Sequence, residues 1–175
     1  MKVLVLDTSA FIIGFNPLSA GLISYSVPAV ERELQPGGFA SVRYKTSREL
    51  GRLIIRMPSN SSHRAVLDKS MELGEKYELS EADVQVLALA LDLEREGKAP
   101  VVVSDDYSIQ NVAEHLALQY SSMATFGISY GFNWIRYCPA CFRKYVQNYS
   151  RSTCEVCGTE LKRKVLKRLP IRKKS

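Results

Sequence analysis

The chain has 175 residues, of which 46% are hydrophobic, with 24 Lys and Arg against 18 Asp and Glu. This length fits one domain of ordinary size with a small appendage, and the apolar content excludes wholesale disorder. No apolar run reaches the ~18–20 residues of a membrane helix, and the run after Lys2 is too short for a secretory signal. We therefore expect a cytoplasmic protein with no membrane partner.

Charge and cysteine content divide the chain near residue 138. Residues 138–175 hold 11 Lys and Arg and 2 Glu, a balance of +9, whereas residues 1–137 have a balance of −3. All four cysteines lie in the basic part. An acidic body joined to a strongly basic end indicates an anionic partner, most often nucleic acid.

Apolar runs at Lys2–Leu6 and Pro100–Ser104 predict two strands, because short runs rich in β-branched residues are typical of strands buried on both faces in a parallel sheet. Apolar positions at helical spacing lie between and after them. They predict a helix that begins after Pro28 and further helices over residues 47–57, 63–77, 80–96 and 111–118, with loops over 35–40 and 57–62. Strands that alternate with helices predict an α/β domain of three layers around a parallel central sheet.

The four cysteines form two Cys-x-x-Cys pairs, Cys138 with Cys141 and Cys154 with Cys157, and twelve residues separate the pairs. This spacing is typical of a zinc ribbon with four thiolate ligands. A redox pair or two disulfides is the alternative, but a thioredoxin-type motif occurs once, at a helix start, and cytoplasmic disulfides are rare. Four protein ligands leave no open position, so we expect one structural Zn²⁺ and no chemistry at this site.

Acidic residues follow both predicted strands. Asp7 comes directly after the first strand and Asp105 and Asp106 come after the second; parallel strands end at the same edge of a sheet, where α/β proteins bind ligands. Asp83 lies in the first turn of the longest predicted helix, and Glu33 lies in the first predicted helix. Carboxylates without basic partners repel one another unless a hard cation neutralises them, so the pattern predicts Mg²⁺ or Mn²⁺. Such a cation can bind phosphate and activate water for attack on phosphorus.

Each of these acids also has a purely structural alternative. Asp83 fits the N3 position of a capping box that begins at Ser80, and Asp106 fits an N-cap. Glu33 and its neighbour Glu31 could be solvated surface charges. Asp7 is the hardest to explain in this way, because a buried apolar strand ends on it.

Other hydrolytic chemistries lack their residues in this sequence. Neither His63 nor His115 lies in a pattern with the nucleophile of a catalytic triad. A phosphate-binding Gly-x-x-x-x-Gly-Lys loop is also absent from the sequence.

Four segments around the acids resemble the acidic motifs of PIN-domain ribonucleases: Val5–Phe11, Val27–Leu34, Leu79–Ala90 and Val103–Ala113. A PIN domain followed by a four-cysteine ribbon and a basic tail resembles the Nob family, and the short chain resembles an archaeal member. The resemblance implies a PIN-like nuclease domain over residues 1–125, a linker over 126–136, a zinc ribbon over 137–160 and a basic C-terminal tail over 161–175. It also implies a metal-dependent endoribonuclease that cuts precursor small-subunit rRNA at its mature 3′ end on the pre-small ribosomal subunit, with other ribosome-assembly proteins as further partners.

Carried over by position, the catalytic and Mg²⁺- or Mn²⁺-binding carboxylates are Asp7, Glu33 (which directly precedes an aliphatic residue, unlike Glu31), Asp83 and an aspartate of the Asp105-Asp106 step. Adjacent residues at a strand end point in opposite directions, so one aspartate of this step would reach the metal and the other would cap the following helix. The family's (Ser/Thr)-x-Asp pattern favours Asp106. Ser104 and either Thr8 or Ser9 would then be supporting hydrogen-bond donors.

Two groups of basic residues are candidates for RNA binding. The first is Arg43, Lys45, Arg48, Arg52 and Arg56, continued by Arg64, in a stretch with the single acid Glu49. Arg48, Arg52 and Arg56 are predicted to share a helix face, and Tyr44 could stack on a base. The second group lies among the aromatic residues of the ribbon and in the tail, and consists of Arg143, Lys144, Lys162, Arg163 and Lys164. A solvated charged surface is the alternative for any single member.

Three functions are compatible with these patterns. The first is the endoribonuclease of ribosome maturation, and the second is an RNA- or pre-ribosome-binding scaffold whose acidic pocket is catalytically silent. Metal-dependent cleavage separates these two. The third is a toxin-type PIN nuclease acting on tRNA or mRNA, against which the ribbon argues because such toxins are usually single domains.

Overall fold

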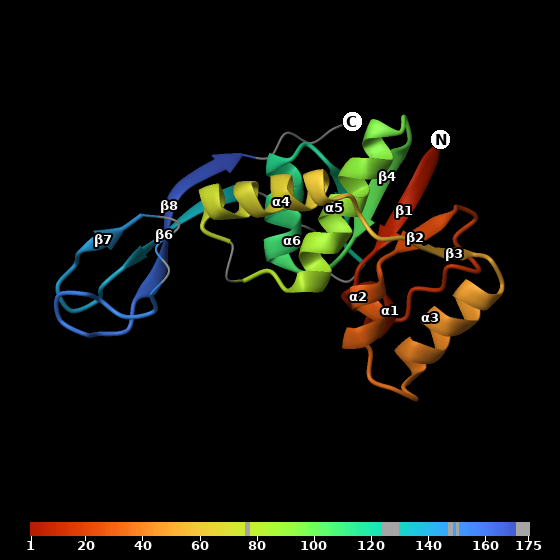
Figure 1. Ribbon diagram of the computed structural model, residues 1–175, viewed down its shortest axis with the longest axis horizontal. Coiled ribbons are helices and arrows are strands. Elements are labelled where there is room, and N and C mark those ends of the chain that lie inside the picture. The colour runs from red at the N-terminus through yellow and green to blue at the C-terminus, as the bar shows by residue number, and fades with distance from the viewer. Residues whose placement is uncertain (76–77, 124–129, 147–148, 150, 171–175) are drawn as a thin grey trace.

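The computed structural model of the chain describes residues 1–75, 78–123, 130–146, 149 and 151–170, with the backbone alone for 130–134 and 165–170. An α/β domain is followed by an elongated arm that ends in two cysteine-containing loops (Figure 1). Among the described residues, every helix is too short or too polar to span a bilayer.

A parallel sheet of five strands forms the centre of the α/β domain, as the sequence predicts. The strands are β1 (Lys2–Leu6), β2 (Ser24–Ser26), β3 (Leu53–Ile55), β4 (Ala99–Val103) and β5 (Gln119–Ser121), in the order β3-β2-β1-β4-β5. The two apolar runs, β1 and β4, are central neighbours, with Leu6 opposite Val103. Their side chains are buried along almost their whole length, which is why these strands read as continuous apolar runs.

In the part of the chain that the structure describes, six helices cover the sheet: α1 (Thr8–Ile13), α2 (Pro28–Glu33), α3 (Phe39–Glu49), α4 (Asn60–Leu73), α5 (Glu81–Arg95) and α6 (Tyr107–His115). Figure 1 shows α4, α5 and α6 grouped on one side of the strands, and α1, α2 and α3 on the other. The chain adds β2 and β3 on one side of β1 and adds β4 and β5 on the other side. Because the crossover connections are right-handed, this reversal of direction places the two groups of helices on opposite faces of the sheet. Val86 to Ala90 of α5 are all buried, so this helix packs on every side of its middle turns.

The helix predicted over residues 47–57 is wrong. Helix α3 covers Phe39–Glu49, and the chain turns at Gly51, whose φ of 68° is left-handed, before entering β3. Leu53 and Ile54 fit a helical pattern, but their backbone pairs in parallel with β2. The predicted loops 35–40 and 57–62 likewise contain the first turns of α3 and α4, and α6 begins at Tyr107, four residues earlier than predicted.

The C-terminal part differs from the expected linker and tail. Strand β6 (Tyr130–Tyr137) occupies most of the expected linker, and β8 (Lys162–Pro170) occupies most of the expected tail. The two strands pair antiparallel from Tyr130 with Pro170 to Tyr137 with Lys162, and β7 (Lys144–Tyr145) adds to the other edge of β6. We call the β6–β8 pair the arm. Residues 171–175, with three more basic side chains, lie outside the described residues.

The arm is joined to the α/β domain through Arg163. Its guanidinium contacts the carboxylate of Glu75 at 2.9 Å and that of Glu78 at 2.8 Å, both in the segment between α4 and α5. The Glu75 side chain is only 3% exposed and also accepts a hydrogen bond from the Asn111 amide in α6. The buried Glu75 carboxylate therefore connects the segment between α4 and α5 and helix α6 to the arm.

Candidate active site and cysteine cluster

Asp7 and the Asp105-Asp106 step lie at the point where the chain leaves β1 and β4 in opposite directions. In α/β proteins this switch point opens a crevice at the carboxyl ends of the strands, where ligands bind. Asp7 directly follows β1, and its backbone N–H donates to the carbonyl of Val103 at the end of β4. Asp105 and Asp106 follow β4 after Ser104.

Asp7 is buried and hydrogen-bonded through one oxygen. Oδ2 accepts bonds from the hydroxyls of Ser9 at 2.7 Å and Ser104 at 2.9 Å, and from the Ser9 backbone N–H at 3.3 Å. Oδ1 is fully buried and has no hydrogen-bond partner in the described part of the chain. Burial raises the pKa of the Asp7 carboxyl, although the Ser9 and Ser104 hydroxyls oppose the shift. A buried carboxylate oxygen without a partner is a position where a cation would be bound.

Asp83 has both the structural and the electrostatic role that its position allowed. It completes a capping box at the start of α5, in which Ser80 N–H donates to Asp83 Oδ2 at 2.7 Å and Asp83 N–H donates to the Ser80 hydroxyl at 3.2 Å. Burial, with a smaller contribution from the charges of Asp7 and Asp106, raises the pKa of the Asp83 carboxyl to about 7, against the hydrogen bonds from Ser80, which lower it. The three aspartates therefore repel one another at a common site.

Asp105 and Asp106 point in different directions. Asp106 caps α6, where Oδ1 accepts the backbone N–H of Ser108 at 2.6 Å and of Ile109 at 3.3 Å, and its charge acts on Asp83. Asp105 Oδ1 instead accepts bonds from the Ser122 hydroxyl and the Met123 N–H, beyond the end of β5. The expected division between a cap and a site residue is thus not seen, because Asp106 fills the cap and also faces the other acids.

The two glutamates of α2 have different partners. The Thr8 hydroxyl, next to Asp7, donates to Glu33 at 2.6 Å. Glu31 forms an ion pair with Arg48 at 2.9 Å. The geometry therefore brings Glu33 toward the site and holds Glu31 away from it.

We call Asp7, Glu33, Asp83 and Asp106 the carboxylate cluster. Its possible ligand atoms are all oxygens, the charges of Asp7 and Asp106 act on Asp83, and Asp7 Oδ1 is buried without a hydrogen-bond partner among the described residues. A hard divalent cation is the ligand that such a set fits, because oxygen donors are what Mg²⁺ and Mn²⁺ prefer. Among the described residues, only the four cysteines bring their ligand atoms together closely enough to surround one ion, so metal binding by the carboxylate cluster stays a prediction.

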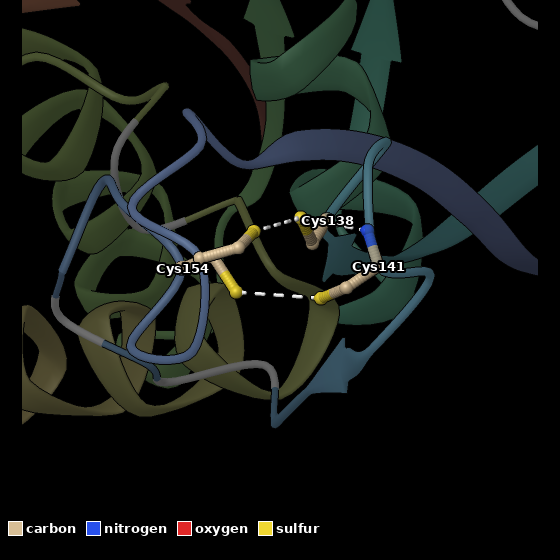
Figure 2. Close-up of side chains that lie close together, drawn as sticks. Cys138, Cys141 and Cys154 are labelled. Carbon is tan, nitrogen blue, oxygen red and sulfur yellow. Dashed lines mark hydrogen bonds between the residues drawn. The ribbon is translucent and has the colours of Figure 1, made fainter.

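The four cysteines also come together, as their spacing predicts. Their sulfur atoms all lie within 4.8 Å of one another and form no disulfide. Figure 2 shows the thiols of Cys138, Cys141 and Cys154 facing one another between the two loops. A tetrahedral Zn²⁺ with bonds of about 2.3 Å holds sulfurs about 3.8 Å apart, so the observed spacing fits one metal ion.

Tyr145 supports the cysteine cluster. Its hydroxyl lies 2.9 Å from Cys154 Sγ, and its ring packs against Tyr149 with the ring centres 4.4 Å apart. Burial opposes ionisation of Cys154, but this hydroxyl and the backbone amides of Cys157 and Val156 outweigh it and lower the pKa of the thiol to about 6. The sequence did not predict the contact of Tyr145 with Cys154, because aromatic and basic residues alternate in this segment and their spacing does not distinguish a buried tyrosine from an exposed one.

The first basic group does not form the helix face that was predicted. Arg48 belongs to α3, Arg52 follows it in the turn, and Arg56 follows β3 and forms an ion pair with Glu96. Arg43 donates to the carbonyl of Phe11. The exposed members are Lys45, Arg48, Arg52 and Arg64.

Tyr44, expected as a stacking residue, is fully buried. It packs edge-to-face on Phe11 with the ring centres 5.3 Å apart. It is a core residue because it falls on the inner side of α3, with Ser41 and Ser47.

The second basic group contains both exposed and engaged side chains. Lys144 and Lys162 are exposed, and the exposed Arg143 forms an ion pair with Glu155 at 3.3 Å. Lys164 lies over the Tyr137 ring, 4.9 Å from its centre, and Arg163 binds the α/β domain. The role of Arg163 was missed because Glu75, its buried partner, has no sequence signal of its own.

Comparisons with known proteins identify the family. A family model described as the PIN domain of ribonuclease matches residues 4–93. Endoribonuclease Nob1 of Methanothermobacter thermautotrophicus is 38% identical over 161 residues, 91% of each chain, and that of Methanocaldococcus jannaschii is 34% identical over 95% of this chain and 80% of its own. Ribonuclease VapC1 of Thermoplasma acidophilum is 33% identical over 94% of this chain and 79% of its own. The fold agrees with these matches, because acidic residues follow the central parallel strands and four thiols meet at the end of the arm. The chain belongs to the Nob1 family of PIN-domain endoribonucleases.

Proposed function

We propose that this endoribonuclease cuts precursor small-subunit rRNA at its mature 3′ end, in the cytoplasm and on the pre-small ribosomal subunit. The observation that carries the proposal is the buried, unpartnered Oδ1 of Asp7 within a carboxylate cluster, in a chain of the Nob1 family. The resemblance to the Nob family supplies the choice of RNA.

Asp7, Glu33, Asp83 and Asp106 would hold Mg²⁺ or Mn²⁺. When bound, this ion supplies Lewis-acid activation of the phosphodiester and of the attacking water. The serines at the switch point fix the Asp7 carboxylate through Oδ2, so that Oδ1 keeps one direction. Thr8 orients Glu33 through its hydroxyl. The hydrogen bonds from Ser9, Ser104 and Thr8 would hold the carboxylates in place before RNA binds. A metal-dependent nuclease needs its metal ligands oriented in advance in this way.

The cysteine cluster would hold one structural Zn²⁺, because four thiolates at tetrahedral spacing select zinc among common divalent ions and leave no position for substrate. The exposed side chains of Arg143, Lys144 and Lys162 would then contact RNA phosphates from the ribbon. Other ribosome-assembly proteins would be further partners.

The test is cleavage of precursor small-subunit rRNA by the full chain with Mn²⁺. Asp7→Asn and Asp83→Asn each remove a charge and preserve the shape of the side chain. Loss of a residue that only supports a metal ligand lowers activity by roughly 10–100-fold, so loss of a ligand should slow cleavage by at least that much. RNA affinity should change little. Asp68→Asn, an exposed acid of α4, is the matched control and should cut normally. Full activity of either site variant would refute the carboxylate assignment.

A second candidate substrate class is tRNA or mRNA. It belongs to the toxin-type interpretation of the sequence, and relatives named Ribonuclease VapC1 and Ribonuclease VapC3, at least 33% identical to this chain, show that the similarity extends beyond the proteins named Nob1. Presenting precursor rRNA, tRNA and mRNA to the same enzyme preparation decides between the two. Cleavage of precursor rRNA at one position supports the first function, and cleavage confined to tRNA or mRNA supports the second.

A further inference from the structure

The two cysteine loops have the same backbone structure. In the first loop the N–H of Phe142 donates to the carbonyl of Cys138 at 2.9 Å, and in the second the N–H of Gly158 donates to the carbonyl of Cys154 at 2.8 Å. The residue that follows each second cysteine has a left-handed conformation, with φ of 59° at Phe142 and 72° at Gly158. Phe142 and Gly158 are therefore equivalent positions.

Glycine is the residue that this conformation favours. A Cβ placed on Gly158 would meet no atom within 4 Å, so glycine is needed there for its backbone and not for space. Phe142 takes the same conformation with a large side chain, which strains the backbone of any L-residue that carries a Cβ. The first loop thus holds a phenylalanine where its own duplicate shows that glycine is the relaxed choice.

Packing does not offset this strain. The Phe142 side chain is 74% exposed, whereas the nearby Tyr145 is buried against the cysteine cluster. Its surroundings on the surface are cationic and apolar, with Arg143 and Lys144 next to it in the chain and both exposed. A strained, exposed aromatic side chain that contributes neither to the core nor to the turn is best explained by contact with a partner.

We propose that Phe142 stacks on an unpaired nucleobase of RNA while Arg143 and Lys144 contact the neighbouring phosphates. An aromatic platform beside cations is how proteins bind single-stranded nucleic acid without reading its sequence. The Arg143–Glu155 pair is exposed on both sides, so a phosphate can replace the carboxylate at little cost. The inference rests on the proposed function only in that the ligand is RNA.

The test uses the full, zinc-loaded chain and its Phe142→Gly variant. Affinity is measured for a fluorescein-labelled oligoadenylate and for an oligomer of equal length with abasic riboses. We expect the variant to lose about tenfold in affinity for oligoadenylate and nothing for the abasic oligomer. Phe142→Trp should keep the affinity. Val146→Ala, which shortens another exposed apolar side chain directly after β7, is the control and should bind as the parent does.

The same proteins are compared for melting temperature and for zinc release to a chelator. Phe142→Gly should melt at the same or a higher temperature and release zinc no faster, because glycine relieves the left-handed strain. Equal oligoadenylate affinity in parent and variant would overturn the proposal. So would an equal loss of affinity for the abasic oligomer, which would exclude base stacking, and so would faster zinc release or easier melting, which would make Phe142 a structural residue. Neither readout involves cleavage, so failure to cut precursor rRNA would refute the proposed function and leave this inference standing.

Discussion

Asp7 accepts three hydrogen bonds through Oδ2 and, in the described residues, none through Oδ1. Leaving a buried oxygen unpaired costs the metal-free protein about 1–3 kcal/mol. A cation that binds the folded state alone repays this cost and adds stability that grows with its concentration. The site is therefore stabilised by the ion that it would use.

As a proposed metal ligand, Asp83 should make metal binding depend on pH. Its carboxyl has a pKa of about 7 because it is buried beside Asp7 and Asp106, so below pH 7 a proton competes with the metal ion. We expect affinity for Mn²⁺ to fall by roughly tenfold for each pH unit below 7 and to level off above it. Calorimetric titration of the zinc-loaded protein between pH 5.5 and 8 measures this. In Asp83→Asn the affinity should be lower and the bend near pH 7 should disappear.

The same pKa acts on folding in the opposite sense when no metal is bound. A carboxyl whose pKa is raised in the folded state stabilises it at low pH, and this stability is lost as pH rises through the folded value, here about 7. The increase in melting temperature on adding Mn²⁺ should therefore be larger at pH 8 than at pH 6. An increase that is independent of pH would contradict the role given to Asp83.

The roles of Asp105 and Asp106 can be distinguished by replacing each aspartate with asparagine. Asparagine caps a helix as well as aspartate does, so Asp106→Asn should leave α6 and the overall stability nearly unchanged while it removes a charge from the carboxylate cluster. We expect cleavage to fall by about 10–100-fold in Asp106→Asn and by far less in Asp105→Asn. Comparing the two rates at equal melting temperature is the measurement, and the reverse order would assign the site to Asp105.

At the scale of elements, the sequence predicts those helices and strands whose own residues determine their structure. Strands β1 and β4 are buried on both faces, so their apolar runs and the acids that end them are visible without any structure. The ends of α5 were predicted to within a residue because Ser80 and Gly97 mark them. Strands β2, β3 and β5 were missed because each has three residues, and neighbouring strands rather than composition define them.

The candidate site shows the same division. The strands that precede them were enough to place Asp7 and the Asp105-Asp106 step at one edge of the sheet, whereas Asp83 was placed only in the first turn of the long helix. Which oxygen of Asp7 lacks a partner depends on two serines that are 95 residues apart, and no local pattern gives that. The burial of Tyr44 and Tyr145 could not be predicted either, because helix register and the strand pairing at the ribbon determine it.

The cysteine loops allow a test of Tyr145. Its hydroxyl lies against Cys154, and partners of this kind are worth about 10–100-fold in metal affinity. Tyr145→Phe should therefore speed zinc release to a chelator by about tenfold. Tyr149→Phe is the matched control, because the Tyr149 hydroxyl is buried without a hydrogen-bond partner among the described residues, and its loss should not speed release. Equal release rates in all three proteins would make the Tyr145 contact irrelevant to the metal.

At the scale of the whole molecule, the Arg163–Glu75 ion pair joins the arm to the α/β domain, in addition to the contacts of β6 with α4 and α6. Removing the arginine leaves a buried carboxylate without its ion-pair partner, so Arg163→Gln should destabilise the protein by about 3 kcal/mol in chemical denaturation. Glu78→Gln removes only the more exposed contact of the same guanidinium and should cost less than about 1 kcal/mol.

Orientation gives a second readout for this pair. The arm should move relative to the α/β domain in Arg163→Gln, and residual dipolar couplings of the two parts should no longer fit one rigid body. Glu78→Gln should keep the parent orientation. If the cut position on precursor rRNA depends on where the arm holds the strand, Arg163→Gln should also cut less uniformly. Unchanged couplings and unchanged stability would show that Arg163 does not hold the arm.

The pairing of β1 with β4 has a consequence for synthesis on the ribosome. Asp7 is made almost at once, but Ser104, which binds its carboxylate, is 97 residues later in the chain, and Asp106 follows after that. A nascent chain that has not yet exposed β4 outside the exit tunnel has neither the second edge of β1 covered nor its carboxylates assembled. We therefore expect the proposed carboxylate cluster to assemble, and cleavage to become possible, only when translation of the α/β domain is nearly complete.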